Sequence, residues 1–258
     1  MCALEWLSGR LRRGLGCSLV LGLSVPLLAV AAPSSSVAAI QAVQPGAGIV
    51  ATLSNLKTLS RWAYPEAAVA VHSGPTQRSR VLGHLKLLTG DGQAQPYLAL
   101  RSYSVGSSKW ILVPLPGRPN GLKGWVQAHA LGEMHVTRDH LRIDRETLQA
   151  SLYRGARQIW NAPVGVGRPA LPTPTGHFYV IEKLIAVGSP IYGPYALGTS
   201  AYAPTLSEWP GGGVVGIHGT NEPQLIPGRP SHGCIRLRDA AVARLWQIIN
   251  VGTPIEIV

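Results

Sequence analysis

The chain has 258 residues, of which 46% are hydrophobic and 14% charged, so it is long enough to fold around one large core or two small ones. It contains 30 glycines and 21 prolines, which exceeds average usage but stays below the level typical of disordered chains and favours many short strands and turns. The formal net charge of +11 favours acidic partners, but the basic residues lack the aromatic-interleaved blocks that indicate nucleic-acid binding.

Residues 1–31 have the composition of a signal peptide. Arg10, Arg12 and Arg13 precede an apolar run from Leu15 to Val30, and the small residues at its end suit cleavage. The run is shorter than the roughly 20 residues that a membrane span requires, so cleavage is favoured over retention as an anchor. We therefore expect export to the periplasm or cell wall.

Cleavage would leave Cys234 as the sole cysteine and exclude an intramolecular disulfide. It would lower the formal charge from +11 to +9, because three arginines and Glu5 are lost. An unpaired thiol outside the cytoplasm is exposed to oxidation, so a reactive role would explain it. The remaining positive charge would attract anionic wall polymers, although it also fits a role in solubility alone.

A linker is predicted at residues 32–58 and a small β-barrel domain at residues 59–135. Short apolar stretches recur between turns in the second segment, which is typical of short strands. These stretches are Ala68–Val71, Val81–Leu88, Tyr97–Leu100, Trp110–Val113 and Trp125–Ala128. The strings Val71–Pro75 and Lys123–Val126 resemble the first turn and closing strand of bacterial Src-homology-3-like domains, which implies a binding or spacing module.

Longer strands are predicted in a mainly β domain at residues 136–258. They cover Leu141–Asp144, Thr147–Tyr153, Gln158–Val166, His177–Leu184 and Pro254–Val258. Three prolines mark Gly167–Thr175 as a loop, and Ile185–Trp209 is expected to be an irregular, aromatic-bearing insertion.

One helix is predicted in the C-terminal region. Its apolar residues recur at i, i+3, i+4 and i+7, which gives one stripe that can pack against a sheet. The stripe consists of Val242, Leu245, Trp246 and Ile249. Asp239 is expected to cap this helix and Gly252 to end it.

Cys234 lies near two histidines and an arginine, a grouping that indicates acyl transfer by a cysteine nucleophile. His232 would share a face with Cys234 along an extended strand, whereas His218 would reach it through a loop that joins two adjacent strands. Residue types alone leave a buried structural cysteine open, and also a zinc site made of the two histidines and Cys234. They also leave open which histidine is the base.

The strings Ile217–Thr220 and Ser231–Leu237 resemble the signature of L,D-transpeptidases with a YkuD-type catalytic domain. Further similar blocks occur in the same order at Leu141–Asp144, Val164–Gly167, Thr173–Phe178 and Gly193–Gly198. The resemblance covers about residues 136–258. It implies a catalytic β-sandwich with one helix.

The resemblance also implies roles for individual residues. Cys234 would be the nucleophile and His218 the general base, oriented by the carbonyl of Gly219, while His232 would line the pocket. The backbone N–H groups of Gly233 and Cys234 would form an oxyanion hole.

The same comparison implies three substrate contacts. Arg236 would bind a carboxylate of the substrate through its planar guanidinium, and Ser231 and Tyr195 would contact the substrate as well. Tyr195 belongs to an aromatic group that could keep water from the reaction. The other members are Tyr192, Tyr202 and Trp209.

The sequence thus predicts an exported L,D-transpeptidase that acts on peptidoglycan stem peptides and forms 3→3 cross-links as a monomer, without a metal ion or other cofactor. The alternatives are a peptidase or carboxypeptidase that hydrolyses the stem, and a non-catalytic wall-binding protein. In wall peptidases of the NlpC type the cysteine precedes its histidine, whereas both histidines precede Cys234 here.

Overall fold

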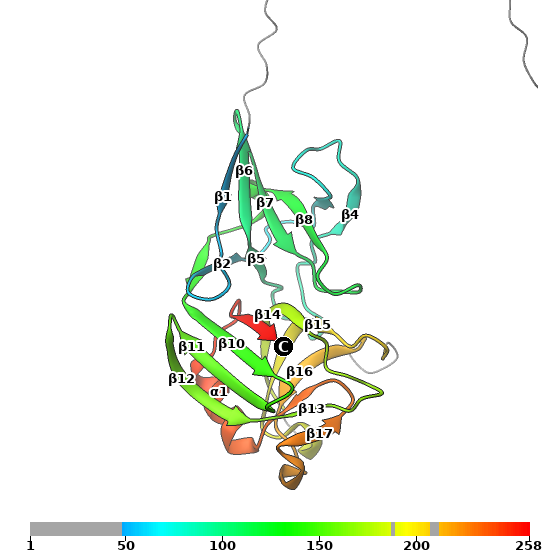
Figure 1. Ribbon diagram of the computed structural model, residues 1–258. Coiled ribbons are helices and arrows are strands. Elements are labelled where there is room, and N and C mark those ends of the chain that lie inside the picture. Colours follow the sequence, from blue (N-terminus) through cyan, green and yellow to red (C-terminus); the bar gives the residue numbers. More distant parts are fainter. Residues whose placement is uncertain (1–47, 187–188, 207–211) are drawn as a thin grey trace, which may run out of the picture. The chain divides into compact units, whose positions relative to one another are not determined.

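The computed structural model describes residues 48–186, 189–206 and 212–258 (Figure 1). The predicted signal peptide and most of the predicted linker lie outside these residues.

Residues 49–137 form two small sheets. A six-stranded sheet has the order β1-β6-β7-β8-β3-β4, and a three-stranded sheet has the order β5-β2-β9. The strands are β1 (Ile49–Thr52), β2 (Ser60–Ala63), β3 (Ala70–His72), β4 (Val81–His84), β5 (Tyr97–Ala99), β6 (Arg101–Val105), β7 (Ser108–Pro114), β8 (Lys123–Gln127) and β9 (His135–Thr137), with a 3-10 turn η1 (Ala128–Ala130) after β8. Both sheets contribute to one buried apolar cluster, as Ala63 and Ile111 show. The resemblance to Src-homology-3-like domains stays a prediction.

Residues Ile49–Thr52, expected in the linker, instead form the edge strand β1 and pair with β6. All four side chains of β1 are exposed, so the strand has no alternation between buried and exposed residues that would reveal it in the sequence.

The remaining strands form one mixed sheet of ten strands. Its order is β12-β11-β10-β19-β14-β15-β16-β18-β13-β17. The strands are β10 (Asp139–Asp144), β11 (Gln149–Arg154), β12 (Arg157–Pro163), β13 (Gly165–Gly167), β14 (Gly176–Ile185), β15 (Tyr195–Tyr202), β16 (Val214–His218), β17 (Gly228–Ser231), β18 (Ile235–Arg236) and β19 (Pro254–Ile257), with 3-10 turns η2 (Pro190–Tyr192) and η3 (Pro223–Leu225). The first three strands predicted in this domain are found as β10, β11 and β12, which pair in order as an antiparallel meander.

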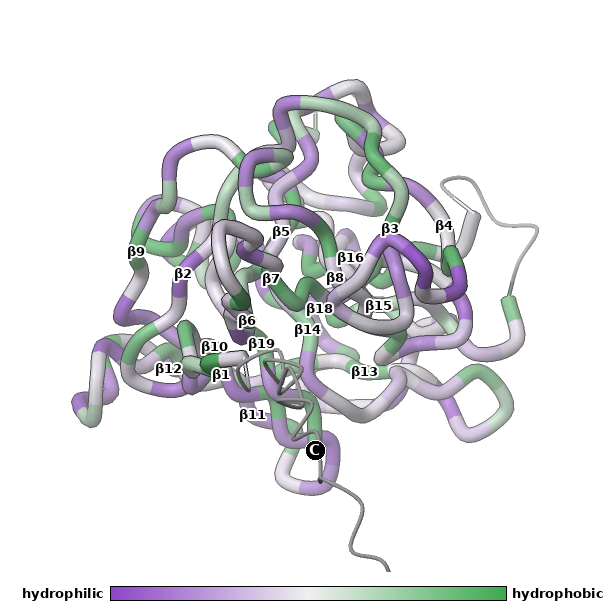
Figure 2. Tube along the Cα trace, turned by 90° about the horizontal axis from the view of Figure 1, so that it is seen from above, coloured by the Kyte–Doolittle hydropathy of each residue, from purple (hydrophilic) through white to green (hydrophobic). Residues whose placement is uncertain are grey.

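The central strand β14 is buried on both faces. Phe178 and Val180 point into the main apolar core, whereas Tyr179 and Ile181 pack with Leu98 of β5. A strand covered on both faces reads as a continuous apolar run, which Phe178–Ile181 is. Elsewhere along the chain hydrophobic and hydrophilic residues alternate over short distances (Figure 2).

The predicted helix is confirmed as α1 (Asp239–Ile248), which contacts β15 and β16. Val242, Leu245 and Ile249 of the predicted stripe are fully buried. The expected cap is wrong, because Asp239 is the first residue of the helix and no side chain caps it. Within the described residues, no helix has the length and apolarity needed to cross a membrane.

The expected irregular structure at Ile185–Trp209 is wrong for Tyr195–Tyr202, which form β15 at the centre of the sheet. Half of this strand is Ala, Gly or Ser, which do not favour strands, and pairing with β14 and β16 on its two sides holds it in the sheet.

A loop of the N-terminal part is bonded to the segment that follows β15. Asn120 pairs with Tyr202 as a strand would, donating to its carbonyl at 2.7 Å and accepting from its N–H at 2.9 Å. The Arg118 guanidinium donates to the carbonyls of Ala203, Leu206 and Gly212 at 2.7–3.0 Å. This segment is therefore held in place by residues outside the ten-stranded sheet.

We predict that Arg118→Ala loosens the segment after β15, because three carbonyl groups lose their donor. Amide hydrogen exchange of Ala203 and Gly213 should accelerate about tenfold, while the core strand β10 stays protected. Arg101→Ala is the matched control, since that side chain is exposed. Equal exchange in both variants would contradict the prediction.

Candidate active site

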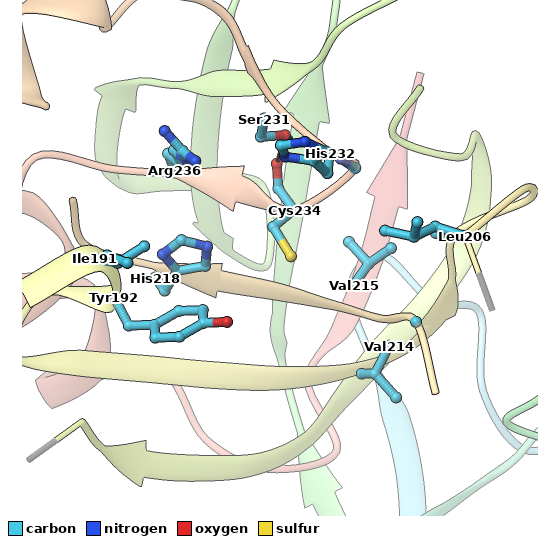
Figure 3. A pocket seen from close by; sticks show the side chains of 13 residues that line it. Ile191, Tyr192, Leu206, Val214, Val215, His218, Ser231, His232, Cys234 and Arg236 are labelled. Carbon is cyan, nitrogen blue, oxygen red and sulfur yellow. Dashed lines mark hydrogen bonds between the residues drawn. The ribbon is translucent and has the colours of Figure 1, made fainter. Parts of the chain in front are cut away.

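A small cleft contains most of the predicted site residues (Figure 3). Its volume is about 50 Å³, room for one or two water molecules at liquid density. The lining residues are Ile191, Tyr192, Ala203, Leu206, Gly213, Val214, Val215, His218, Ser231, His232, Gly233, Cys234 and Arg236. Of the predicted candidates, Gly219 and Tyr195 do not line it.

Parallel pairing of β16 and β18 brings the two parts of the motif together. His218 lies opposite Arg236 and Ile217 opposite Ile235, so β16 and β18 are the expected adjacent strands. The connection between them is not a simple loop, because it contains η3 and the strand β17, which pairs with β13. The buried side chains of Ile217 and Ile235 fix this register from the core side.

Cys234 immediately precedes β18 and lies beside Gly216 of β16. The Gly216 N–H donates to the Cys234 sulfur at 3.4 Å. The extended strand expected from His232 to Cys234 is wrong, because residues 232–234 leave the strand conformation in a bend between β17 and β18. Alternation along a strand therefore does not place His232 beside the thiol.

A hydrogen-bonded turn holds Cys234 in position. The Ser231 hydroxyl donates to the Cys234 carbonyl at 2.6 Å and accepts from the Gly233 N–H at 3.1 Å. Thr173 donates to the Gly233 carbonyl at 2.8 Å and accepts from the Gly167 N–H at 2.9 Å. Gly233 has a φ of 124°, which side chains other than hydrogen rarely permit.

This turn affects two expected roles. Ser231 is 1% exposed and its hydroxyl is bonded within the turn, which gives it a structural function in this state. The Gly233 N–H, expected in an oxyanion hole, is bonded to Ser231. Thr173 had no predicted role, yet its hydroxyl links the turn to β13.

His218 is a neutral imidazole with a defined tautomer. Its Nδ1 lies 2.7 Å from the Gly219 carbonyl, which can only accept, so Nδ1 carries the proton. Burial lowers the pKa of His218 to about 4, and the charge of Arg236 acts in the same direction, while the bond to Gly219 opposes both. At neutral pH the unprotonated Nε2 is therefore available as a base.

The thiol is also uncharged at rest. Burial raises the pKa of Cys234, although the Gly216 N–H and the charge of Arg236 partly offset this. With the two pKa values shifted in opposite directions, transfer of the thiol proton to His218 is unfavourable before a substrate binds.

His232 lies on a different side of the Cys234 side chain from His218 (Figure 3). Burial lowers the pKa of His232, and the charges of Arg168 and Arg236 lower it further. Among the described residues, no three His, Cys, Asp or Glu side chains are grouped closely enough to hold a metal ion, so the geometry does not assemble the zinc alternative.

Arg236 is largely buried and paired with a carboxylate of the protein. Its Nη1 donates to Glu222 at 2.9 Å, while its Nε is buried without a hydrogen-bond partner. Part of the guanidinium is thus already occupied, and the buried Nε remains as a donor.

The aromatic residues divide into two groups. Tyr195, the expected substrate contact, stacks on Trp246 of α1 at 4.8 Å and does not line the cleft. Tyr192 lines the cleft, and its ring meets that of His218 edge to face at 4.9 Å. Trp209 lies outside the described residues.

Residues 138–257 match the family model for the L,D-transpeptidase catalytic domain, YkuD. A Bacillus subtilis protein named for L,D-transpeptidase YkuD is 35% identical over 45% of this chain and 62% of its own length. An Escherichia coli relative named for L,D-transpeptidase YbiS is 25% identical over 74% of this chain and 70% of its own length. These matches support a YkuD-type L,D-transpeptidase catalytic domain. The chain spans less than two thirds of the B. subtilis relative.

Solved structures also match part of the chain. Bd1075 of Bdellovibrio bacteriovorus is 25% identical over 47% of this chain and 48% of its own, with a TM-score of 0.39. The catalytic domain of the Enterococcus faecium L,D-transpeptidase is 22% identical over 46% of this chain and 95% of its own, with a TM-score of 0.36. Residues 138–257, which match the family model, include every predicted catalytic residue.

We predict that Thr173→Val destabilises the turn that carries Cys234, because valine keeps the shape but leaves the Gly233 carbonyl and the Gly167 N–H without a partner. The free energy of unfolding should fall by about 1–3 kcal/mol in urea titration. Thr205→Val at an exposed position is the control and should change stability by less than about 0.5 kcal/mol. A loss no larger than in the control would contradict the role of Thr173.

Proposed function

We propose that the protein is an exported L,D-transpeptidase in which Cys234 is the nucleophile and His218 the general base. The observation that carries this proposal is the tautomer of His218. Its Nδ1 proton is held by Gly219, so Nε2 is the free base in a cleft that also contains the thiol.

In the first step the Cys234 sulfur attacks the carbonyl carbon of the third residue of a stem tetrapeptide. His218 Nε2 takes the thiol proton and gives it to the amine of the terminal D-alanine as the C–N bond breaks, which leaves a thioester. An acceptor amine then attacks the thioester and loses a proton to His218. The new amide is the 3→3 cross-link, and the proton returns to the thiolate.

The proton moves together with the attack rather than before it. The pKa of His218 is lowered to about 4 and that of Cys234 is raised, so the ion pair is scarce in the resting enzyme. As the thiol proton leaves, the Gly216 N–H and the charge of Arg236 favour negative charge on the sulfur. This negative charge then passes to the carbonyl oxygen as the sulfur bonds to carbon.

The oxyanion would be stabilised by backbone donors of the Cys234 turn. The Cys234 N–H is the first candidate. The Gly233 N–H can join it only if the Ser231 hydroxyl gives up its bond to that group, which a developing negative charge would favour.

Arg236 is the proposed contact for a carboxylate of the stem. A substrate carboxylate would bind the Arg236 guanidinium in place of Glu222, whose side chain is exposed and can move away. The cleft is small, at about 50 Å³, so most of the stem would lie outside it. Ile191 and Tyr192 at the cleft would then help to exclude water from the thioester.

Export is proposed from the leader-like composition of residues 1–31, and anionic wall polymers are proposed partners of the basic surface. The Src-homology-3-like resemblance at residues 59–135 fits a part that holds the enzyme on the wall. We also propose that the enzyme is active as a monomer.

We predict that incubation with a disaccharide tetrapeptide produces an acyl adduct on the wild type and none on Cys234→Ala. Intact-mass spectrometry detects the adduct, and thermal unfolding of the variant checks that its fold is kept. Addition of an acceptor stem should yield a cross-linked dimer. Release of free tripeptide alone would identify a hydrolase, and an adduct on Cys234→Ala would refute the assignment of the nucleophile.

We predict that the acylation rate stays nearly constant from pH 8 down to pH 5 and falls as the pH drops through about 4. Protonation removes the base, and the pKa of His218 in the folded protein is about 4 instead of the ordinary 6.5. Rates come from quenched-flow mass spectrometry, with circular dichroism to confirm the fold at each pH.

His232→Ala is the control for this profile and should keep its midpoint, whereas His218→Ala should lose about 10²- to 10⁴-fold in rate at neutral pH. A larger loss of rate in His232→Ala than in His218→Ala would identify His232 as the base, and a midpoint near the ordinary 6.5 would contradict the lowered pKa of His218.

A further inference from the structure

The peptide unit between Gly219 and Thr220 is hydrogen-bonded at both of its ends. Its carbonyl oxygen accepts the Nδ1 proton of His218 at 2.7 Å, and its N–H donates to Oδ1 of Asp239 at 2.9 Å. One amide therefore connects a carboxylate to the imidazole. The N–H and C=O groups of an amide belong to one conjugated system. An anion that accepts a hydrogen bond from the N–H therefore makes the carbonyl oxygen a stronger acceptor.

The position of Asp239 is defined by close contacts. A Cβ on Gly193 or on Gly219 would overlap its Oδ1, so both positions require glycine while the carboxylate occupies this place. Gly193 follows Tyr192, whose ring meets that of His218. Asp239 thus contacts both the loop that orients His218 and the turn that covers it.

We propose that Asp239 is a positioning residue for His218 that acts through the Gly219–Thr220 peptide. The carboxylate fixes the orientation of the carbonyl, and it stabilises the imidazolium that forms when His218 takes the thiol proton. The arrangement places a carboxylate, a base and a thiol in series, with a peptide unit between the first two. This inference rests on the proposed function of His218 as the base.

A simpler role for Asp239 is stabilisation of α1. It is the acidic residue in the first turn of that helix, where a negative charge favours the helix dipole. Ala240 is the next residue and is exposed, so a glutamate there restores the charge without reaching the Thr220 N–H in the same way. The two roles can therefore be separated by variants.

The test compares Asp239→Asn, Asp239→Ala and the double variant Asp239→Ala with Ala240→Glu. Asparagine keeps an acceptor for Thr220 but removes the charge, and acylation should slow about 3- to 5-fold. Alanine removes both, and the rate should fall about tenfold. The double variant should regain thermal stability without regaining rate. Full recovery of the rate in the double variant would overturn the proposal.

A second measurement is independent of turnover. The Nδ1 proton of His218 should give a downfield NMR signal in the free protein, which moves upfield in Asp239→Asn because its acceptor is weakened. An unchanged signal together with unchanged rates would show that Asp239 serves only the helix. If the wild type forms no adduct but its signal depends on Asp239, the proposed function fails and the link between Asp239 and His218 stands.

Discussion

The site depends on the parallel pairing of β16 with the two-residue strand β18. This pairing places the Gly216 N–H at the Cys234 sulfur and brings His218 into the same cleft. β18 is held on its other side by β13, where Gly165 pairs with Arg236. A slip by one residue would turn Ile235 out of the core and Cys234 into it, so burial of one isoleucine also fixes the position of the nucleophile.

Burial determines the charge state of the catalytic pair. Cys234 and His218 are both uncharged at rest, because burying an ion without a partner raises the free energy of the folded protein. The raised pKa of Cys234 and the lowered pKa of His218 reflect this desolvation cost. A neutral thiol is also less easily oxidised than a thiolate, which suits a free cysteine in a protein that we propose is exported. The groups that favour charge are mainly backbone dipoles fixed by the sheet, which need little reorganisation when the substrate arrives.

The sequence predicted the elements whose patterns are local. The meander and the stripe of α1 follow alternation and helical spacing, whereas β1 is exposed throughout and β15 is made of small residues, so neither has a pattern to detect. The motif placed Cys234, His218 and Arg236 together. It could not choose between the histidines, because the choice depends on a hydrogen bond to Gly219 and on the bend after Ser231. The sequence also suggested that Asp239 caps the helix. Its observed partner, the Thr220 N–H, is distant in sequence, so no local pattern reveals that hydrogen bond.

The shape of the cleft and its chemistry depend on different parts of the chain. The catalytic pair lies within residues 138–257, the segment that matches the family model. Ala203, Leu206 and Gly213 form part of the cleft wall, and the segment they belong to is bonded to Arg118 and Asn120, outside that match. Because these bonds go to backbone carbonyls, substitutions in this part of the wall can leave them intact, whereas changes at Arg118 or Asn120 would remove them. The N-terminal part can thus alter the shape of the cleft while Cys234, His218 and their hydrogen bonds stay unchanged.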